Sequence, residues 1–203
     1  MRLLSILAVL FANIWLYADI PSGLIRTGES LPPNTYELVL IPQYVFTAKA
    51  VYLTSELRYQ PHEDIGVGFS FGSGQLGYNF GTNATWYILS DLPSQPALAL
   101  LGGVYFNRME GENFFVAKLA PTVSRLFKIG RSTVTPYGAL QLSPSFALGN
   151  GTNQFAMKTS IGTQAAFEIL NGLRFWWELG LSIVNSMHEM SFGVSYPFAA
   201  LGG

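Results

Sequence analysis

The sequence predicts an all-β fold, a transmembrane up-and-down antiparallel β-barrel of about ten strands, and three observations lead to it. Between residues 35 and 198, apolar residues alternate with small polar residues, which is the period of a strand with one apolar face. The apolar stretches run for about ten residues, the length that a tilted membrane strand needs and longer than a usual soluble strand. Only 11% of the residues are Asp, Glu, Lys or Arg, compared with roughly 25% in typical soluble domains.

The polar face of the expected strands distinguishes a membrane barrel from a soluble one. A face turned to water carries many Lys, Glu and Asp residues, whereas this face is mostly Gly, Ser, Thr, Asn and Gln. Aromatic residues such as Tyr36, Tyr59 and Tyr196 fall near the ends of the stretches, where the interfacial girdles of membrane barrels lie. The pattern therefore favours a barrel that is apolar outside and polar inside.

The chain divides into four expected segments. Residues 1–18 are predicted to be a secretory signal peptide, because a basic residue precedes a long apolar run that ends close to Ala18. Residues 19–34 show no period and are predicted to be a periplasmic lead-in segment. The barrel is expected over residues 35–198, and residues 199–203 form a C-terminal tail.

The expected strands are recognised from their alternation and from the turn residues between them. The clearest covers residues 65–72, where Ile, Val and Phe alternate with Gly and Ser. The least polar covers residues 97–106, whose second face is mostly Ala and Leu. The other strands are expected at residues 36–43, 51–59, 76–88, 115–124, 134–148, 155–168, 173–183 and 189–198.

Prolines interrupt several of these expected strands, at Pro42, Pro121, Pro136 and Pro144. Proline has no N–H, so each one removes a hydrogen bond from a ladder, and a closed barrel has no free edge to tolerate that loss. The prolines therefore mark bulges or water-exposed parts of strands, or else the strand number differs from about ten and is eight or twelve.

Charged residues fall on the inward face of the expected strands. They are Glu37, Glu56, Arg58, Lys118, Lys158, Glu168, Arg174 and Glu178. A charge on the lipid face costs about 2–4 kcal/mol at the bilayer midplane, which supports the inward assignment. Two interpretations stay open: an ion-pair network that plugs a narrow barrel, or a polar constriction that selects solutes. Small barrels tend to be filled by their own side chains.

Residues for catalysis, metal binding or cofactor binding are scarce, and none of these sites is predicted. There are no cysteines, and His188-Glu189-Met190-Ser191 departs from the zinc-binding H-E-x-x-H pattern because Phe192 takes the second His position. His62 lies in an expected turn. The formal net charge is −1 and no basic cluster occurs, so nucleic acid is not an expected partner.

The last expected strand ends on Ser191-Phe192-Gly193-Val194-Ser195-Tyr196-Pro197-Phe198. This octet resembles the C-terminal assembly signal of small bacterial outer-membrane β-barrels, through Ser191, Gly193, Tyr196 and Phe198. The resemblance implies export to the outer membrane of a Gram-negative bacterium. It also implies outer-membrane lipids, lipopolysaccharide and the barrel-assembly machinery as partners, and it says nothing of the oligomeric state.

The sequence and the resemblance together favour a non-enzymatic outer-membrane barrel, either structural or a small porin-like passive channel. One alternative is a lipid-modifying barrel enzyme, which needs a catalytic cluster at one rim. For that cluster the chain offers only His62 and His188 as obvious bases. The other alternative is a surface adhesin-like barrel, which usually displays long loops, whereas every expected loop here is short.

Overall fold

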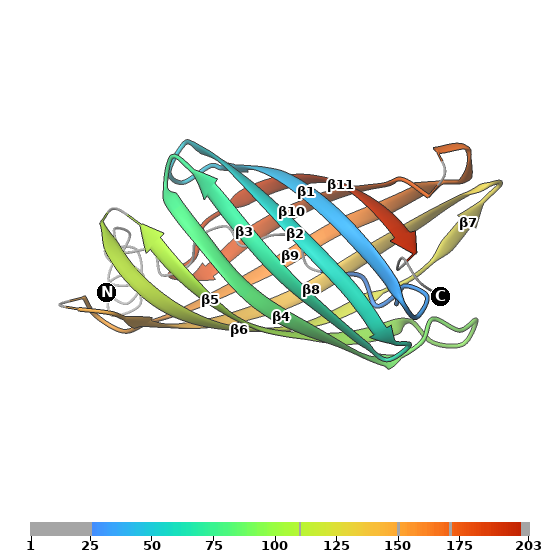
Figure 1. The fold of residues 1–203 in the computed structure, drawn as a ribbon, viewed down its shortest axis with the longest axis horizontal. Coiled ribbons are helices and arrows are strands. Elements are labelled where there is room, and N and C mark those ends of the chain that lie inside the picture. The colour runs from blue at the N-terminus through green and yellow to red at the C-terminus, as the bar shows by residue number, and fades with distance from the viewer. Residues whose placement is uncertain (1–25, 110, 150, 171, 200–203) are drawn as a thin grey trace, which may run out of the picture.

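The structure is a computed structural model that describes residues 26–109, 111–149, 151–170 and 172–199, and it is a closed antiparallel barrel (Figure 1). Its wall consists of β1 (Thr35–Val45), β2 (Ala50–His62), β3 (Ile65–Gly74), β4 (Gly77–Leu89), β5 (Ala97–Met109), β6 (Glu112–Ser124), β8 (Ser132–Ala147), β9 (Gln154–Phe167), β10 (Arg174–Val184) and β11 (Glu189–Ala199). Each wall strand pairs with the next along the chain, and β1 pairs with β11 to close the wall. The predicted fold class and the ten wall strands are confirmed.

One short strand was not expected. β7 (Phe127–Ile129) pairs with the first residues of β8 and makes a small hairpin between β6 and β8. It lies at the end of the barrel where β1 begins and β11 ends, which is called here the terminal end (Figure 1). The opposite end, which holds the β1–β2 and β10–β11 turns, is called the far end. No helix in the described residues is long and apolar enough to cross a membrane.

The four prolines do lie inside wall strands, and the ladder adapts to them on one side. The pairing of β1 with β11 skips Ile41 and Pro42, whereas β1 stays paired with β2 at both positions. Likewise the pairing of β6 with β8 skips Pro121, which stays opposite Leu100 of β5. Because a missing N–H affects only one of a strand's two ladders, the closed wall survives and the strand count remains ten.

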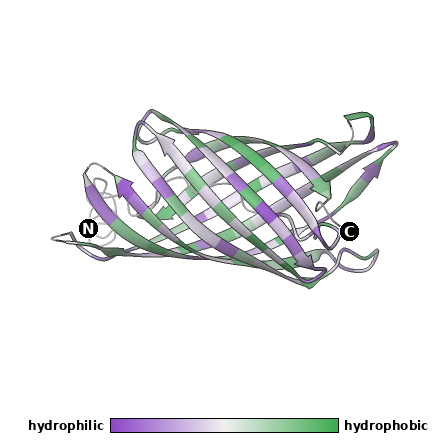
Figure 2. Ribbon diagram, in the orientation of Figure 1, coloured by the Kyte–Doolittle hydropathy of each residue, from purple (hydrophilic) through white to green (hydrophobic). Residues whose placement is uncertain are grey.

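The two faces of the wall differ in polarity, as the alternating colours along the strands in Figure 2 show. On β1, the outward Leu38 is 47% exposed, whereas its neighbour Glu37 is 2% exposed and faces the lumen. The same contrast separates Phe69 from Ser70 on β3, and Ile161 from Ser160 on β9. The barrel is therefore apolar outside and carries its buried charges inside, the reverse of a soluble barrel.

The lumen is less polar than the sequence suggested. Its middle holds a cluster of buried apolar side chains, with Val39, Ile41, Leu101 and Trp176 among them. A second cluster joins Tyr105, Phe114 and Val116. The weakly polar face of β5 thus points inward, where it packs against the opposite wall, because a narrow barrel fills its interior with side chains.

Glycine makes room for the bulkiest of these inward side chains. A Cβ on Gly162 would lie 2.6 Å from the Tyr137 ring, and a Cβ on Gly72 would lie 2.6 Å from the Tyr52 ring. Real Cβ atoms do not approach other atoms so closely. The glycines of the polar face therefore allow large side chains to cross the lumen, and they need not mark turns.

Candidate functional site: an ion-pair network in the lumen

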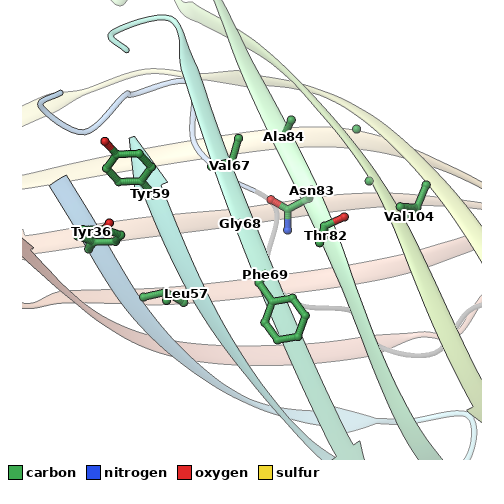
Figure 3. A pocket seen from close by; sticks show the side chains of 12 residues that line it. Tyr36, Leu57, Tyr59, Val67, Gly68, Phe69, Thr82, Asn83, Ala84 and Val104 are labelled. Carbon is green, nitrogen blue, oxygen red and sulfur yellow. The ribbon is translucent and has the colours of Figure 1, made fainter. Parts of the chain in front are cut away.

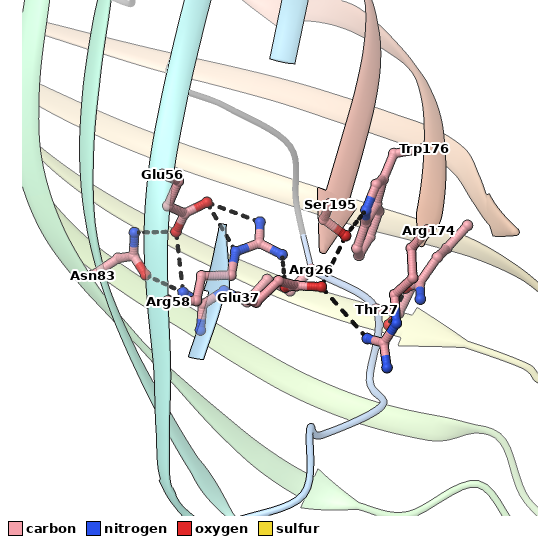
Figure 4. A network of polar contacts seen from close by, with 10 residues as sticks. Arg26, Thr27, Glu37, Glu56, Arg58, Asn83, Arg174, Trp176 and Ser195 are labelled. Atoms are coloured by element: carbon pink, nitrogen blue, oxygen red, sulfur yellow. Dashed lines mark hydrogen bonds and ion pairs between the residues drawn. The ribbon is translucent and has the colours of Figure 1, made fainter. Parts of the chain in front are cut away.

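The candidate site is a network of buried charges towards the terminal end, with Arg58 at its centre (Figure 4). Arg58 Nη2 lies 2.8 Å from Glu56 Oε2, and Arg58 Nη1 lies 3.2 Å from Glu37 Oε2. Strand geometry explains these contacts. Glu56 and Arg58 are two residues apart on β2 and share a face, and Glu37 is the cross-strand partner of Arg58 on β1.

The network continues across the β1–β11 closure. Ser195 donates a hydrogen bond to Glu37 Oε1 at 2.8 Å, and Arg174 Nη1 lies 3.6 Å from the same oxygen. Trp176 Nε1 donates to the Ser195 hydroxyl at 3.0 Å, and the Trp176 ring lies 5.4 Å from the Arg58 guanidinium carbon. The cation–π contact and the shared carboxylate tie β1, β2, β10 and β11 together.

Residues 26–31, called here the lumenal segment, lie inside the barrel rather than outside it. Arg26 Nη2 donates to Glu56 Oε1 at 3.0 Å and to Asn83 Oδ1 at 2.8 Å. The Gly28 amide donates to the Ser124 hydroxyl at 2.8 Å. These contacts link the segment to β2, β4 and β6, so it bridges the lumen. No sequence period pointed to this, because the segment is not a strand.

Further contacts hold the lumenal segment against the opposite wall. Thr27 donates to Gln164 Oε1 of β9 at 3.3 Å, and Thr135 of β8 donates to Glu29 Oε2 at 3.4 Å. Burial raises the pKa of the Glu29 carboxyl above its ordinary value, and the nearby Arg174 partly offsets this effect. The Glu29 carboxyl is therefore more easily protonated than an exposed one.

Little space remains within this network. The cavity lined by the lumenal segment, Glu37, Arg58, Arg174 and Trp176 has a volume of about 10 Å³. A cavity of this volume has room for about one water molecule. At this level the lumen is filled by the segment and the ion pairs.

The other predicted charges also occupy defined places. Lys158 of β9 pairs with Glu189 of β11 at 2.5 Å, and Lys118 lies 5.1 Å from the centre of the Tyr105 ring. Glu178 accepts a hydrogen bond from Tyr137 at 2.8 Å. The structure therefore distributes the predicted inward residues over several groups along the lumen.

Glu168 is the exception, because it is exposed and does not face the lumen. β9 ends at Phe167, and residues 168–170 form a 3-10 turn, so strand parity no longer applies to them. Two residues of the lumenal ion pairs, Arg26 and Glu189, were absent from the predicted set. Glu189 has inward parity on the last strand and was detectable, whereas Arg26 carries no local signal.

A second cavity lies on the outer wall over β1 to β5, with a volume of about 630 Å³ (Figure 3). Its lining includes Leu57, Val67, Phe69 and Val104. It also includes Ala84 and Gly102, whose small or absent side chains leave the space of the groove unfilled. Its lining contains no Asp, Glu, His, Lys or Arg. It is a mainly apolar groove on the outside of the barrel, and the phenols of Tyr36 and Tyr59 are the titratable groups in its lining.

The two histidines are not brought together. His62 ends β2 at the terminal end, with its side chain 67% exposed and 3.7 Å from Asp64. His188 is exposed in the β10–β11 turn at the far end. In the described part of the chain, no group of three or more His, Asp or Glu residues could hold a metal ion.

Comparisons with known proteins add a likeness of fold. No protein-family model and no curated protein matches the sequence. A de novo designed transmembrane β-barrel is similar over 83% of this chain and 99% of its own, with 15% identity and a TM-score of 0.40. An outer membrane channel from Pseudomonas putida F1 is similar over 89% of this chain and 100% of its own, with 11% identity and a TM-score of 0.45.

Proposed function

We propose that this protein is a bacterial outer-membrane β-barrel whose lumen is closed at rest by its own side chains and by the lumenal segment. The observation that carries the proposal is the inverted polarity of the barrel, with an apolar outer wall around buried ion pairs. In this role the barrel is a structural membrane protein or a closed channel, not an open porin.

The outer wall supports the membrane location. Every wall strand exposes large apolar side chains, as Leu38, Val51, Val67, Phe80, Val104, Phe115, Leu140, Phe155, Phe175 and Phe192 illustrate. A soluble monomer rarely exposes a contiguous apolar patch larger than a few hundred Å². A belt around the whole barrel is favourable only against lipid. The lipid acyl chains also fill the outer groove in this proposal.

The last strand supports the proposed assembly route. Ser191 and Gly193 face the lumen, whereas Tyr196 and Phe198 face outward at the terminal end, where β11 pairs with β1. The stack of Phe198 on Tyr36, with ring centres 5.7 Å apart, joins the two closing strands. We therefore propose the barrel-assembly machinery, outer-membrane lipids and lipopolysaccharide as partners.

Export and insertion are tested by fractionating cells that express the protein. We expect it in the outer-membrane fraction, where the folded barrel migrates differently in unboiled and boiled gel samples. The difference in migration arises because the stable, closed strand ladder keeps the barrel folded until the sample is boiled. Recovery from the soluble periplasm with identical migration in both samples would falsify the proposed location.

The orientation of the wall is tested with single cysteines, because the natural chain has none. Cysteine at Ile161, which is 50% exposed, is expected to react with a lipid-soluble maleimide and to resist a charged one in vesicles. Cysteine at the neighbouring Ser160, which is fully buried, serves as the matched control and should resist the lipid-soluble reagent. The reverse pattern would mean that lipid does not cover the outer wall.

A further inference from the structure

The place where Arg26 binds has the features of a preformed cation site. Glu56 divides its carboxylate between two partners, because Oε2 accepts from Arg58 at 2.8 Å and Oε1 accepts from Arg26 at 3.0 Å. Asn83 donates to the same Oε1 at 2.9 Å and offers its own Oδ1 to Arg26 at 2.8 Å. Two buried acceptors thus converge on one guanidinium nitrogen.

The backbone of β3, at two glycines without side chains, forms the remaining wall of this site. A Cβ on Gly68 would lie 2.6 Å from Arg26 Nη2, and a Cβ on Gly66 would lie 2.9 Å from Nη1. Both nitrogens therefore lie against the β3 backbone, in a slot that a Cβ at either glycine would enter. A planar guanidinium fits such a slot and reaches the acceptors at the same time.

The slot and its occupant belong to different parts of the molecule. Glu56, Gly68 and Asn83 lie on three successive wall strands, which the ladder holds rigidly together. Arg26 lies in the lumenal segment, outside every ladder. Apart from Arg26, the segment is held by the 2.8 Å hydrogen bond from the Gly28 amide to Ser124 and by two longer ones, at 3.3 and 3.4 Å, none of which involves a residue of the slot. The segment can therefore leave without dismantling the slot.

We propose that this slot, formed by Glu56, Asn83, Gly66 and Gly68, is a recognition site for a small guanidinium cation. Arg26 occupies it in the closed barrel, and a solute cation takes the same place when the lumenal segment is displaced. The proposal rests on the closed-lumen function proposed above and gives it a ligand class. An empty slot would leave Glu56 Oε1 with the Asn83 amide as its donor and would take the Arg26 donor away from Asn83 Oδ1, and both losses disfavour the vacant state.

The test uses the full-length Arg26→Ala variant, folded in detergent micelles, and methylguanidinium chloride as the probe. We expect the variant to unfold at a lower temperature than the natural protein. Methylguanidinium should raise its unfolding midpoint by a few degrees, in a saturable manner with a millimolar or tighter Kd. Tetramethylammonium chloride at equal concentration should not, because it has no N–H donors. Equal effects of both salts, or no rise, would overturn the site.

Two further variants sharpen this test. Adding Glu56→Gln to Arg26→Ala removes the carboxylate, and we expect the response to methylguanidinium to be lost. Arg125→Ala is the matched control. Arg125 is half-buried at the terminal rim, after β6, whereas the slot lies on β2 to β4. It donates to the backbone oxygens of Leu92 and Pro93 at 2.9 and 3.0 Å and lies 3.5 Å from Asp91 Oδ1. Methylguanidinium should not raise the unfolding midpoint of Arg125→Ala. A rise as large as that of Arg26→Ala would also overturn the proposal.

The design keeps the site separate from the closed-lumen function. If Arg26→Ala fails to refold, Arg26→Gln is titrated with methylguanidinium by calorimetry, and an absence of binding there counts equally against the slot. Because binding is measured in micelles, it does not depend on conductance. Open channels in the natural protein would refute the closed lumen, whereas a missing rescue would refute the cation site.

Discussion

Replacing Glu56 with alanine is expected to lower the free energy of unfolding by about 3–5 kcal/mol, the cost of leaving buried charges without their partner. Glu56 is 5% exposed and pairs with both Arg58 and Arg26. Without it, two guanidinium groups lie close together in the lumen and repel each other. Urea unfolding of the protein in lipid vesicles, followed by tryptophan fluorescence, measures the change.

Glu168→Ala is the matched control for this prediction, since it removes the same carboxylate from an exposed turn. We expect its effect to stay within about 0.5 kcal/mol, as for most surface substitutions. Comparable losses of unfolding free energy for the two variants would contradict the prediction that the ion-pair network stabilises the barrel. If Glu56→Ala lowers the free energy of unfolding only slightly, water or ions replace the ion pairs in the lumen.

The natural protein is expected to show little or no conductance in planar bilayers, and loss of the lumenal segment's anchors should increase the conductance several-fold. The triple variant Arg26→Ala, Thr27→Ala and Glu29→Ala removes the side-chain contacts to β2, β4, β8 and β9. The segment then no longer bridges the lumen at the level of the network, where the cavity beside it is only about 10 Å³. Single-channel recording measures the difference.

A double variant outside the lumen controls for general loosening of the terminal end. Lys128→Ala in the exposed β7 strand, combined with Arg131→Ala in the turn that follows it, removes two charges close to the same rim. We expect this variant to remain closed. Large, steady channels in the natural protein would refute the closed lumen and favour the open porin-like interpretation.

Most of the wall could be predicted from the sequence, because strand alternation is a local property. Once Leu38 faces outward, Glu37 must face inward, and the same rule places Glu56, Arg58 and Lys158. The rule fails at Glu168, because parity holds only while the strand continues and β9 ends one residue earlier. The prolines left the strand number open in the sequence. Only the observed pairing of each proline-containing strand with its two neighbouring strands shows that the gap in pairing affects one ladder and not both.

The partners inside the lumen could not be predicted in the same way. Arg26 meets Glu56 and Asn83 across 30 and 57 residues of chain, and no local pattern encodes such a contact. Lys158 meets Glu189 across 31 residues. Both residues have inward parity, but parity gives the face of a strand and not the residue opposite.

The sequence by itself determined which face of each strand is apolar, the scarcity of charge on the outside, and hence the all-β barrel class. Only the tertiary structure decided that the wall closes with ten strands, that the lumenal segment folds inward, and which charges pair. The physical reason is that alternation is set by backbone geometry within a single strand. Closure and pairing depend on how the strands are staggered around the whole barrel, and on how much room their inward side chains leave.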